Sequence, residues 1–298
     1  MSGIMSRRII AAAMAGFSAL VHAAAPADQP VRLTWFAEPD SEVVVKIAKT
    51  ILEQRLGYKV SLTSASLGLQ YEALGEGKSD AMMMAWLPGT QAAYWDKYQI
   101  KVDDLGTIYS GKIGWVVPDY VPENEVKSIS DLNKPGVAEK FGRAIQGIDP
   151  GAGLMRASGK ALQDYSLKDY TLRPASAVAM IAALSRAENQ KSWIVVTGWS
   201  PHTMFARWKL RYLEDPKGVM GGAEGVHVLT RKGFSQEYPR AAAFFRQYKL
   251  SNDELETVMV KAADTKDYDS AVAEFVANHS SEIDNWTKDA KAQPLHGR

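Results

Sequence analysis

The chain has 298 residues, which is enough for two compact domains or for one large domain. With 46% hydrophobic and 23% charged residues, its composition is that of a globular protein and argues against extended disorder. The formal net charge of +1 argues against a broad nucleic-acid-binding surface, and the absence of cysteine excludes disulfides, thiolate metal sites, a cysteine nucleophile and a lipidated cysteine anchor.

The first residues have the pattern of an export signal. Arg7 and Arg8 precede an apolar stretch over residues 9–21, and small residues follow it up to Ala25. This predicts a cleavable signal peptide over residues 1–25, because the apolar stretch is shorter than the ~18–20 residues that span a bilayer. An uncleaved anchor helix is the alternative. We expect a free periplasmic protein.

The following segment alternates strand and helix patterns. A half-buried strand comes first and is followed by a helix. Asp40 or Ser41 can cap the start of this helix, and Gly57 is placed to end it. The strands are expected at Val31–Trp35, Tyr58–Leu62 and Ala81–Trp86, with a short helix at Leu69–Leu74. Repeated strand–helix–strand units imply a mainly parallel sheet covered by helices.

The alternation of strand and helix patterns changes in the middle of the chain. A strand at Gly111–Pro118 leads into the Pro- and Glu-rich segment 118–125, a plausible crossing, and residues 130–132 open a second α/β unit. The strands of this unit are expected at Ala144–Gly147 and Trp193–Gly198. A return crossing is expected at Gly218–Gly225, before the strand Val226–Leu229. Helices are expected after it, at Pro239–Tyr248, Asp253–Ala263 and Asp269–Trp286. The sequence therefore predicts an α/β fold of two lobes joined by two crossings, with residues 26–112 plus 226–298 in one lobe and 113–225 in the other.

Three tryptophans, Trp35, Trp86 and Trp199, end predicted strands. Ligands of open α/β sheets bind beyond the carboxyl ends of strands, and aromatic faces attract cations, so these rings can form a cage for a quaternary ammonium ion. The other tryptophans are expected to pack in the core: Trp95, Trp115, Trp193, Trp208 and Trp286.

The loop after the strand ending at Gly147 is rich in glycine. Asp149 can cap the next helix and Pro150 suits its first position. Because free amides at a helix start attract anions, the N–H groups of Gly147 and Ile148 can hold a carboxylate. A plain strand-to-helix turn is an equal alternative. With the cage, such a loop suits a zwitterion such as a betaine.

Several co-linear motifs are similar to those of one family. Ala85–Thr90, Gly114–Pro118, Gly147–Gly153, Gly198–His202 and Leu213–Pro216 resemble the glycine betaine-binding proteins of ABC transporters over nearly the whole mature chain. The resemblance implies a two-lobed periplasmic binding-protein fold of type II that delivers a quaternary ammonium compound to a membrane permease. It also implies a cage of Trp35, Trp86 and Trp199, with the amides of Gly147 and Ile148 on the carboxylate. We expect a monomer with no cofactor, no metal and no enzymatic activity.

One position departs from that family. A histidine that often binds the carboxylate is replaced here by Gln91, whose neutral amide can donate a hydrogen bond but carries no charge. Choline, carnitine and related methylated amines therefore stay open as ligands. Glu38 and Asp40 can face a hydroxylated cation, although capping of the following helix is the favoured interpretation.

A periplasmic serine hydrolase is the alternative from another class. Gly198-Trp199-Ser200-Pro201-His202 is close to a nucleophile elbow, but the last position should be glycine, and proline after the serine removes an oxyanion-hole N–H. We expect His202 to belong to the ligand site by ordering the Trp199 loop. The other histidines show no metal-ligand spacing.

Overall fold

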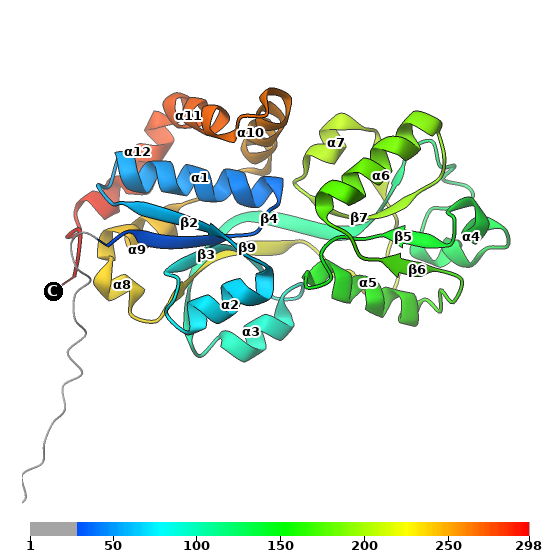
Figure 1. The fold of residues 1–298 in the computed structure, drawn as a ribbon, viewed down its shortest axis with the longest axis horizontal. Helices are drawn as coiled ribbons and strands as arrows, with labels where there is room; N and C mark the ends of the chain where they lie inside the picture. Colours follow the sequence, from blue (N-terminus) through cyan, green and yellow to red (C-terminus); the bar gives the residue numbers. More distant parts are fainter. Residues whose placement is uncertain (1–28, 298) are drawn as a thin grey trace, which may run out of the picture.

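The computed structural model describes residues 29–297 and shows two α/β lobes side by side (Figure 1). The predicted signal peptide of residues 1–25 lies outside the described residues. Within residues 29–297, no helix has both the length and the apolar character needed to cross a membrane.

The first lobe is built on a mixed sheet in which β1 lies between β2 and β3, and β9 follows β3. β1 is parallel to β2 and β3, whereas β9 is antiparallel to β3. These strands are β1 (Val31–Trp35), β2 (Val60–Ser64), β3 (Ala81–Leu87) and β9 (Glu224–Arg231). Figure 1 shows α1 and the last three helices on one face of this sheet and α2 and α3 on the other.

Helices of the first lobe come from both ends of the chain. Those before the crossing are α1 (Pro39–Gln54), α2 (Leu67–Gly75) and α3 (Ala92–Tyr98). Those after it are α8 (Phe234–Glu237), α9 (Pro239–Gln247), α10 (Asn252–Thr265), α11 (Tyr268–Asn278) and α12 (Ser280–Lys291). In α1, Val44, Ile47 and Ile51 recur at helical spacing and are fully buried, so this face packs on the sheet.

The second lobe has a smaller sheet, in which β7 and β6 flank β5 in parallel. The strands are β5 (Ala144–Gln146), β6 (Thr171–Arg173), β7 (Val195–Ser200) and β8 (Leu210–Tyr212). The helices are a short 3-10 turn at Ile129–Asn133, α4 (Val137–Lys140), α5 (Gly153–Asp164), α6 (Ala177–Gln190) and α7 (Thr203–Arg207).

Strand β4 (Val102–Pro118) joins the two sheets. Residues 102–111 pair with β9 in the first lobe, and residues 112–118 pair with β7 and β8 in the second. The crossing predicted at 118–125 is therefore wrong, because Pro118 already pairs with Leu210 inside the second lobe. The chain returns at the start of β9, beside β4 (Figure 1).

Three further expectations need correction. The sheet is not mainly parallel, because both crossing strands, β4 and β9, are antiparallel to their neighbours. Helix α1 begins at Pro39 with Glu38 at the N-cap position, rather than after a cap at Asp40 or Ser41. The helix predicted over Asp269–Trp286 is broken at His279, which ends α11 and precedes α12.

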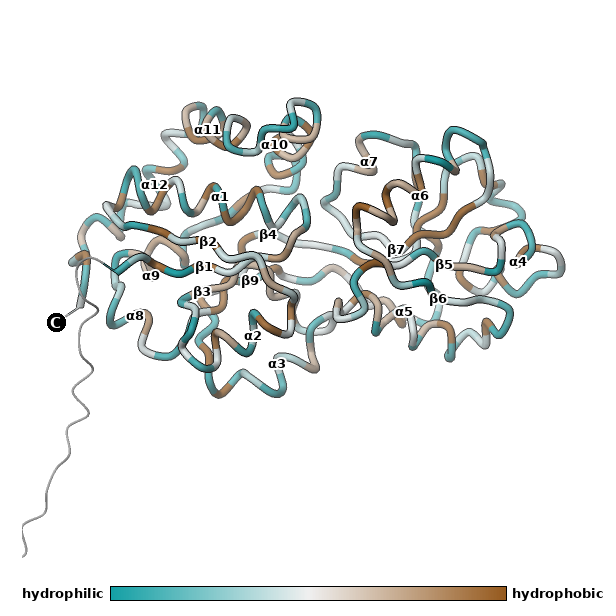
Figure 2. Tube along the Cα trace, viewed as in Figure 1, coloured by the Kyte–Doolittle hydropathy of each residue, from teal (hydrophilic) through white to brown (hydrophobic). Residues whose placement is uncertain are grey.

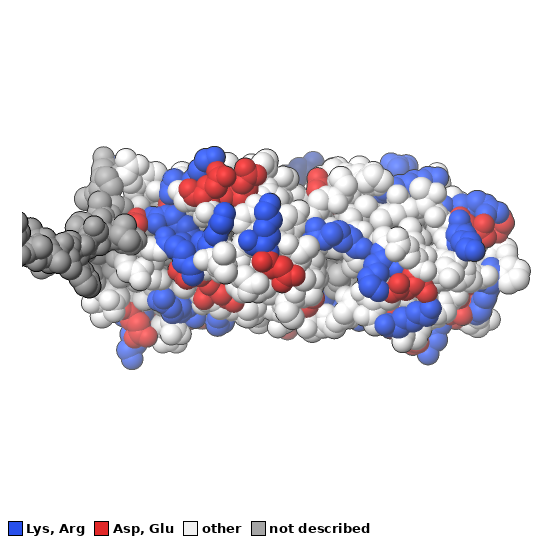
Figure 3. All heavy atoms as spheres, turned by 90° about the horizontal axis from the view of Figure 1, so that it is seen from below, with Lys and Arg blue, Asp and Glu red and all other residues white. Residues whose placement is uncertain are grey.

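Hydrophobic residues occur on the strands and helices of both lobes (Figure 2), and the buried ones form packed clusters. One cluster of buried residues spans the first lobe and the contact region between lobes, and a second cluster fills the core of the second lobe. On the face seen in Figure 3, basic and acidic side chains lie in mixed groups across both lobes, as the near-zero net charge implies.

Candidate functional site

A cavity of about 70 Å³ lies between the lobes, beyond the carboxyl ends of β1, β3, β5 and β7. Its volume is several times the ~10–15 Å³ that a single water needs, so the space is larger than a site for one water. The cavity is lined by residues of both lobes: Phe36, Glu38, Asp40, Leu67, Met84, Trp86, Thr90, Gln91, Ile113, Ile148, Ala152, Gly153, Leu154 and Trp199.

Trp86 forms the wall on the side of the first lobe and is only 7% exposed. Its ring meets Tyr109 edge-on, with centroids 6.3 Å apart, and lies against Gly111 of β4. A Cβ atom at Gly111 would come within 2.2 Å of the Trp86 ring, so glycine is what lets the ring pack there. The crossing strand thus fixes the ring plane toward the cavity.

Trp199 forms the facing wall at the end of β7 and is 5% exposed. His202 does not line the cavity but packs edge-on against the Trp199 ring, with centroids 4.5 Å apart. Its Nδ1 accepts a hydrogen bond of 3.0 Å from the Met204 N–H, which caps α7. Burial lowers the pKa of His202 to about 4, so the imidazole is neutral at physiological pH.

Trp35 is not among the residues that line the cavity. Its side chain is partly buried and packs against the hydrophobic core, and the next residue, Phe36, lines the cavity instead. The structure therefore brings together Trp86, Trp199 and Phe36.

The loop after β5 differs from its prediction. Helix α5 begins at Gly153 with Ala152 at the N-cap, while Asp149 Oδ1 accepts the Gly151 N–H over 2.9 Å, so Asp149 and Pro150 do not start the helix. The Gly147 N–H donates to the Arg173 carbonyl over 2.9 Å.

The Ile148 N–H has only the sulfur of Met155, at 3.4 Å, as its acceptor. Of the two predicted carboxylate-binding amides, that of Gly147 already has a backbone partner, and Ile148 lines the cavity with a weakly held N–H.

Two carboxyl groups face the cavity from the start of α1. Glu38 and Asp40 are 7% and 0% exposed, and within the described part of the chain Glu38 Oε2 and Asp40 Oδ1 have no hydrogen-bond partner. Burial, followed by the charges of Asp40 and Asp149, raises the pKa of Glu38 to about 9. Although Glu38 occupies the N-cap position, its side chain makes no capping hydrogen bond. The favoured capping role is therefore wrong for Glu38.

Asp40 is held from behind by Tyr109, whose hydroxyl donates to Oδ2 over 2.8 Å. Burial raises the pKa of Asp40, and the hydrogen bond from the Tyr109 hydroxyl opposes that rise. The structure describes no cationic side chain paired with either of these two acidic groups, and an uncompensated buried charge is costly.

Gln91 lines the same cavity, but its amide is already engaged by the first lobe. Its Nε2 donates to the Met84 carbonyl over 2.7 Å, and its Oε1 accepts from the Tyr71 hydroxyl over 2.8 Å. The adjacent Thr90 Oγ1 is buried and has no partner in the described structure. Thr90 thus offers the free hydroxyl at the site.

Ser200 and His202, the pair of the hydrolase alternative, have other partners. Ser200 Oγ accepts from the Tyr212 hydroxyl over 3.1 Å, while His202 Nδ1 accepts from the backbone. This geometry does not assemble a serine nucleophile with its base.

Outside the cavity, the described residues bring a histidine beside two glutamates on α10 to α12.

The expectation that the remaining tryptophans pack in the core is confirmed for Trp115 and Trp286. Trp115 is fully buried and donates to Ser158 Oγ over 2.8 Å, and Trp286 is 5% exposed. The others are partly buried against hydrophobic clusters: Trp95, Trp193 and Trp208.

The lobes touch beside the cavity. Tyr94 of α3 donates to the Gly151 carbonyl over 3.2 Å, and the Arg156 guanidinium lies 4.7 Å from the centre of the Tyr94 ring. A Cβ atom at Gly153 would come within 2.0 Å of the Thr90 carbonyl oxygen, so the backbones of the two lobes approach closely there. The structure is that of a closed clamshell.

Comparison with known proteins agrees with this architecture. Residues 29–278 match the family model described as the substrate binding domain of ABC-type glycine betaine transport systems. The glycine betaine/carnitine transport binding protein GbuC of Listeria monocytogenes is 36% identical over 156 residues, which are 52% of this chain and 52% of that protein. The aligned part is thus about half the length of this curated relative.

Two solved structures are similar over most of the chain. The closed, liganded lactococcal OpuAC in complex with glycine betaine is 35% identical, with a TM-score of 0.81 over 87% of this chain and all of that one. An ABC-transporter choline binding protein in complex with choline is 26% identical, with a TM-score of 0.80 over 88% and 97%. The fold is that of a type II periplasmic binding protein, and the chain belongs to the family of substrate-binding domains of ABC-type glycine betaine transport systems.

Proposed function

We propose that the protein binds a quaternary ammonium cation with a neutral polar end, of the choline class, between its lobes. One observation carries the proposal: Glu38 Oε2 and Asp40 Oδ1 are buried without partners among residues 29–297, in a cavity walled by the rings of Trp86 and Trp199. A bound cation would supply the positive charge that compensates the ionised forms of these two carboxyl groups. The choline complex among the similar structures supports this ligand class.

In this proposal, the carboxyl groups and the tryptophan rings both contact the ammonium group of the ligand. A quaternary ammonium ion has no N–H, so it meets carboxylates through charge and meets ring faces through its methyl groups. Each ring contributes ~0.5–2 kcal/mol of cation–π attraction once water is excluded. We assign two walls to Trp86 and Trp199 and the third to Phe36, in place of the Trp35 of the sequence-based prediction.

Glycine betaine is a second candidate because the cavity also offers hydrogen-bond donors. Gly153 and Leu154 line it at the first turn of α5, where N–H groups have no acceptor within the helix. With the free Thr90 hydroxyl and the weakly held Ile148 N–H, they can receive a carboxylate. This arrangement would replace the carboxylate site predicted at Gly147 and Gln91.

We propose that the ligand selects the closed state from an open one. Residues 26–112 plus 226–298 and residues 113–225 would move as two bodies, with the hinge in β4 near residues 111–112 and before β9. The Tyr94–Arg156 contact and the fit of Gly153 on Thr90 would latch the closed form. Binding then shifts the population because only the closed form surrounds the cation.

Family membership supports the wider role. We propose a monomeric periplasmic protein that hands its ligand to the permease of an ABC importer and performs no catalysis. A serine hydrolase is disfavoured because Ser200 pairs with Tyr212 rather than with His202.

Isothermal titration calorimetry with choline, glycine betaine and carnitine tests the proposal. We expect choline to bind most tightly, and Trp86→Ala to weaken binding by ~10-fold or more, which is the loss of one cation–π wall. Trp95→Ala is the matched control, because Trp95 lies outside the cavity. Absence of binding by all three compounds would contradict the proposed function, and equal effects of the two variants would remove Trp86 from the cage.

A further inference from the structure

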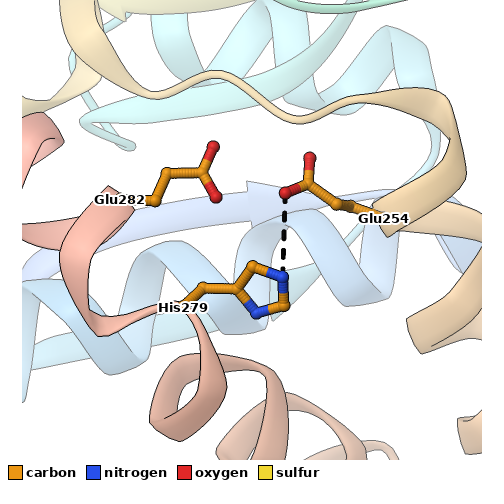
Figure 4. A group of neighbouring side chains, drawn as sticks. All are labelled: Glu254, His279 and Glu282. Carbon is orange, nitrogen blue, oxygen red and sulfur yellow. Dashed lines mark ion pairs between the residues drawn. The ribbon is translucent and has the colours of Figure 1, made fainter.

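Three metal-ligating side chains meet on the C-terminal helices of the first lobe (Figure 4). Glu254 comes from the first turn of α10, His279 from the junction of α11 and α12, and Glu282 from the first turn of α12. One ligand atom of each residue lies within 4.8 Å of the others, and all three residues are partly buried. None of them lines the cavity between the lobes.

The orientation of His279 leaves one ring nitrogen facing the carboxyl groups. Nδ1 lies 2.9 Å from the Phe275 carbonyl oxygen, and because a carbonyl only accepts, Nδ1 carries the hydrogen. Nε2 faces Glu254 Oε1 over 3.8 Å, which is too long for a hydrogen bond. In the neutral imidazole, a nitrogen lone pair and a carboxylate oxygen therefore face each other with room for a cation between them.

Both the ring and the nearer carboxylate are held from outside the group. The imidazole stacks on Phe275, with centroids 4.0 Å apart and planes 20° from parallel. Glu254 Oε2 accepts from the N–H and hydroxyl of Ser251 over 2.8 and 2.5 Å, so Oε1 is left to face His279. A backbone acceptor on the far nitrogen of a histidine is the usual way in which a metal ligand is oriented.

Glu282, in the first turn of α12, completes the group. The guanidinium of Arg55 reaches the same turn of α12 but donates to Ser280 Oγ over 3.0 Å. Carboxylates and imidazole nitrogens are among the ligand types that bind zinc in proteins.

We propose that Glu254 Oε1, His279 Nε2 and the Glu282 carboxylate bind one divalent transition-metal ion, with Zn²⁺ the best match to one imidazole and two carboxylates. Zinc bonds of ~2.0–2.2 Å place tetrahedral ligand atoms ~3.3 Å apart, so the present separations require the side chains to close in slightly. Water takes the fourth position. The ion would clamp α10 to the junction of α11 and α12, a structural role independent of the cavity ligand.

The test uses the tag-free protein after treatment with a chelator. Zinc titrated by calorimetry should bind at one ion per chain, and zinc should raise the melting temperature because an ion that binds only the folded state stabilises it. His279→Gln and Glu282→Gln should each weaken zinc binding by at least ~10-fold and abolish the rise in melting temperature. Cobalt(II) should give a visible absorption band that the His279→Gln variant loses.

Asp289→Asn, which removes an exposed carboxylate from the same helix, is the matched control and should bind zinc as the parent protein does. Melting curves without metal establish that each variant is folded. The proposal is overturned if the parent protein binds no zinc, or if Glu282→Gln and Asp289→Asn bind it equally well.

Discussion

Glu38→Gln should stabilise the ligand-free protein at neutral pH while weakening its binding of cations. Burial and the neighbouring acids raise the pKa of Glu38 from an ordinary 4.5 to about 9. Between these values the unfolded chain releases the proton that the folded protein keeps. Since the folded state then binds more protons, its stability falls as the pH rises through this window. Glutamine keeps the shape of the side chain and removes the titration.

The size of the effect follows from the same two values. From 4.5 to pH 7 is 2.5 pH units, which corresponds to at most ~3 kcal/mol at 1.36 kcal/mol per unit. We therefore expect Glu38→Gln to raise the free energy of unfolding by up to ~3 kcal/mol at pH 7 and to leave it nearly unchanged at pH 4.

Urea unfolding of the ligand-free protein at both pH values measures this difference. Glu72→Gln, an exposed glutamate of α2, is the control and should show no pH-dependent gain. A gain of equal size at pH 4 and pH 7, or a loss at pH 7, would refute the reasoning.

The same substitution tests the role of Glu38 in binding. Because a bound cation favours the ionised carboxyl group, choline binding near pH 8 should release protons from the parent protein and fewer from Glu38→Gln. Calorimetry in buffers of different ionisation enthalpy measures the number released. Equal proton release by the two proteins would show that Glu38 does not face the cation.

Three other substitutions test the geometry of the cavity. Gly153→Ala should hinder closure and weaken ligand binding, because the added Cβ would meet a backbone oxygen of the other lobe. Gly159→Ala, on the same helix, places its Cβ in open space and should bind ligand normally. Small-angle scattering with and without ligand measures closure. Gly111→Ala should displace the Trp86 ring and change the fluorescence response to ligand, and an unaltered response would disprove that packing. Ser200→Ala should leave ligand affinity unchanged, and loss of an ester-hydrolysing activity in this variant would revive the hydrolase alternative.

The sequence predicted the two-lobed fold well because its signals are local. Strand-like runs ended by tryptophan and glycine gave β1 in full and β3 to within one residue. The pairing of β4 with both sheets was not predictable in this way. It depends on which strands lie beside its two halves, and that is decided by contacts far apart in the chain.

The cavity lining was predictable only in part for the same reason. Trp86 and Trp199 line the cavity, but Trp35 is partly buried against the core, because successive residues of an extended chain point in opposite directions. Phe36 takes the place beside the cavity. For Glu38 and Asp40, helix capping was favoured over facing a cation, because their burial depends on contacts far apart in the chain, such as that of Tyr109 on β4 with Asp40.

The most direct test of the central claim compares choline with dimethylbutanol, its neutral carbon isostere, by calorimetry on the same protein. The two compounds have the same shape, so the difference between them isolates the charge that Glu38, Asp40 and the two tryptophans are proposed to hold. Choline should bind with micromolar affinity, about −8 kcal/mol, and the isostere at least ~100-fold more weakly. Equal affinity for the two compounds, or no binding of choline, would contradict the account.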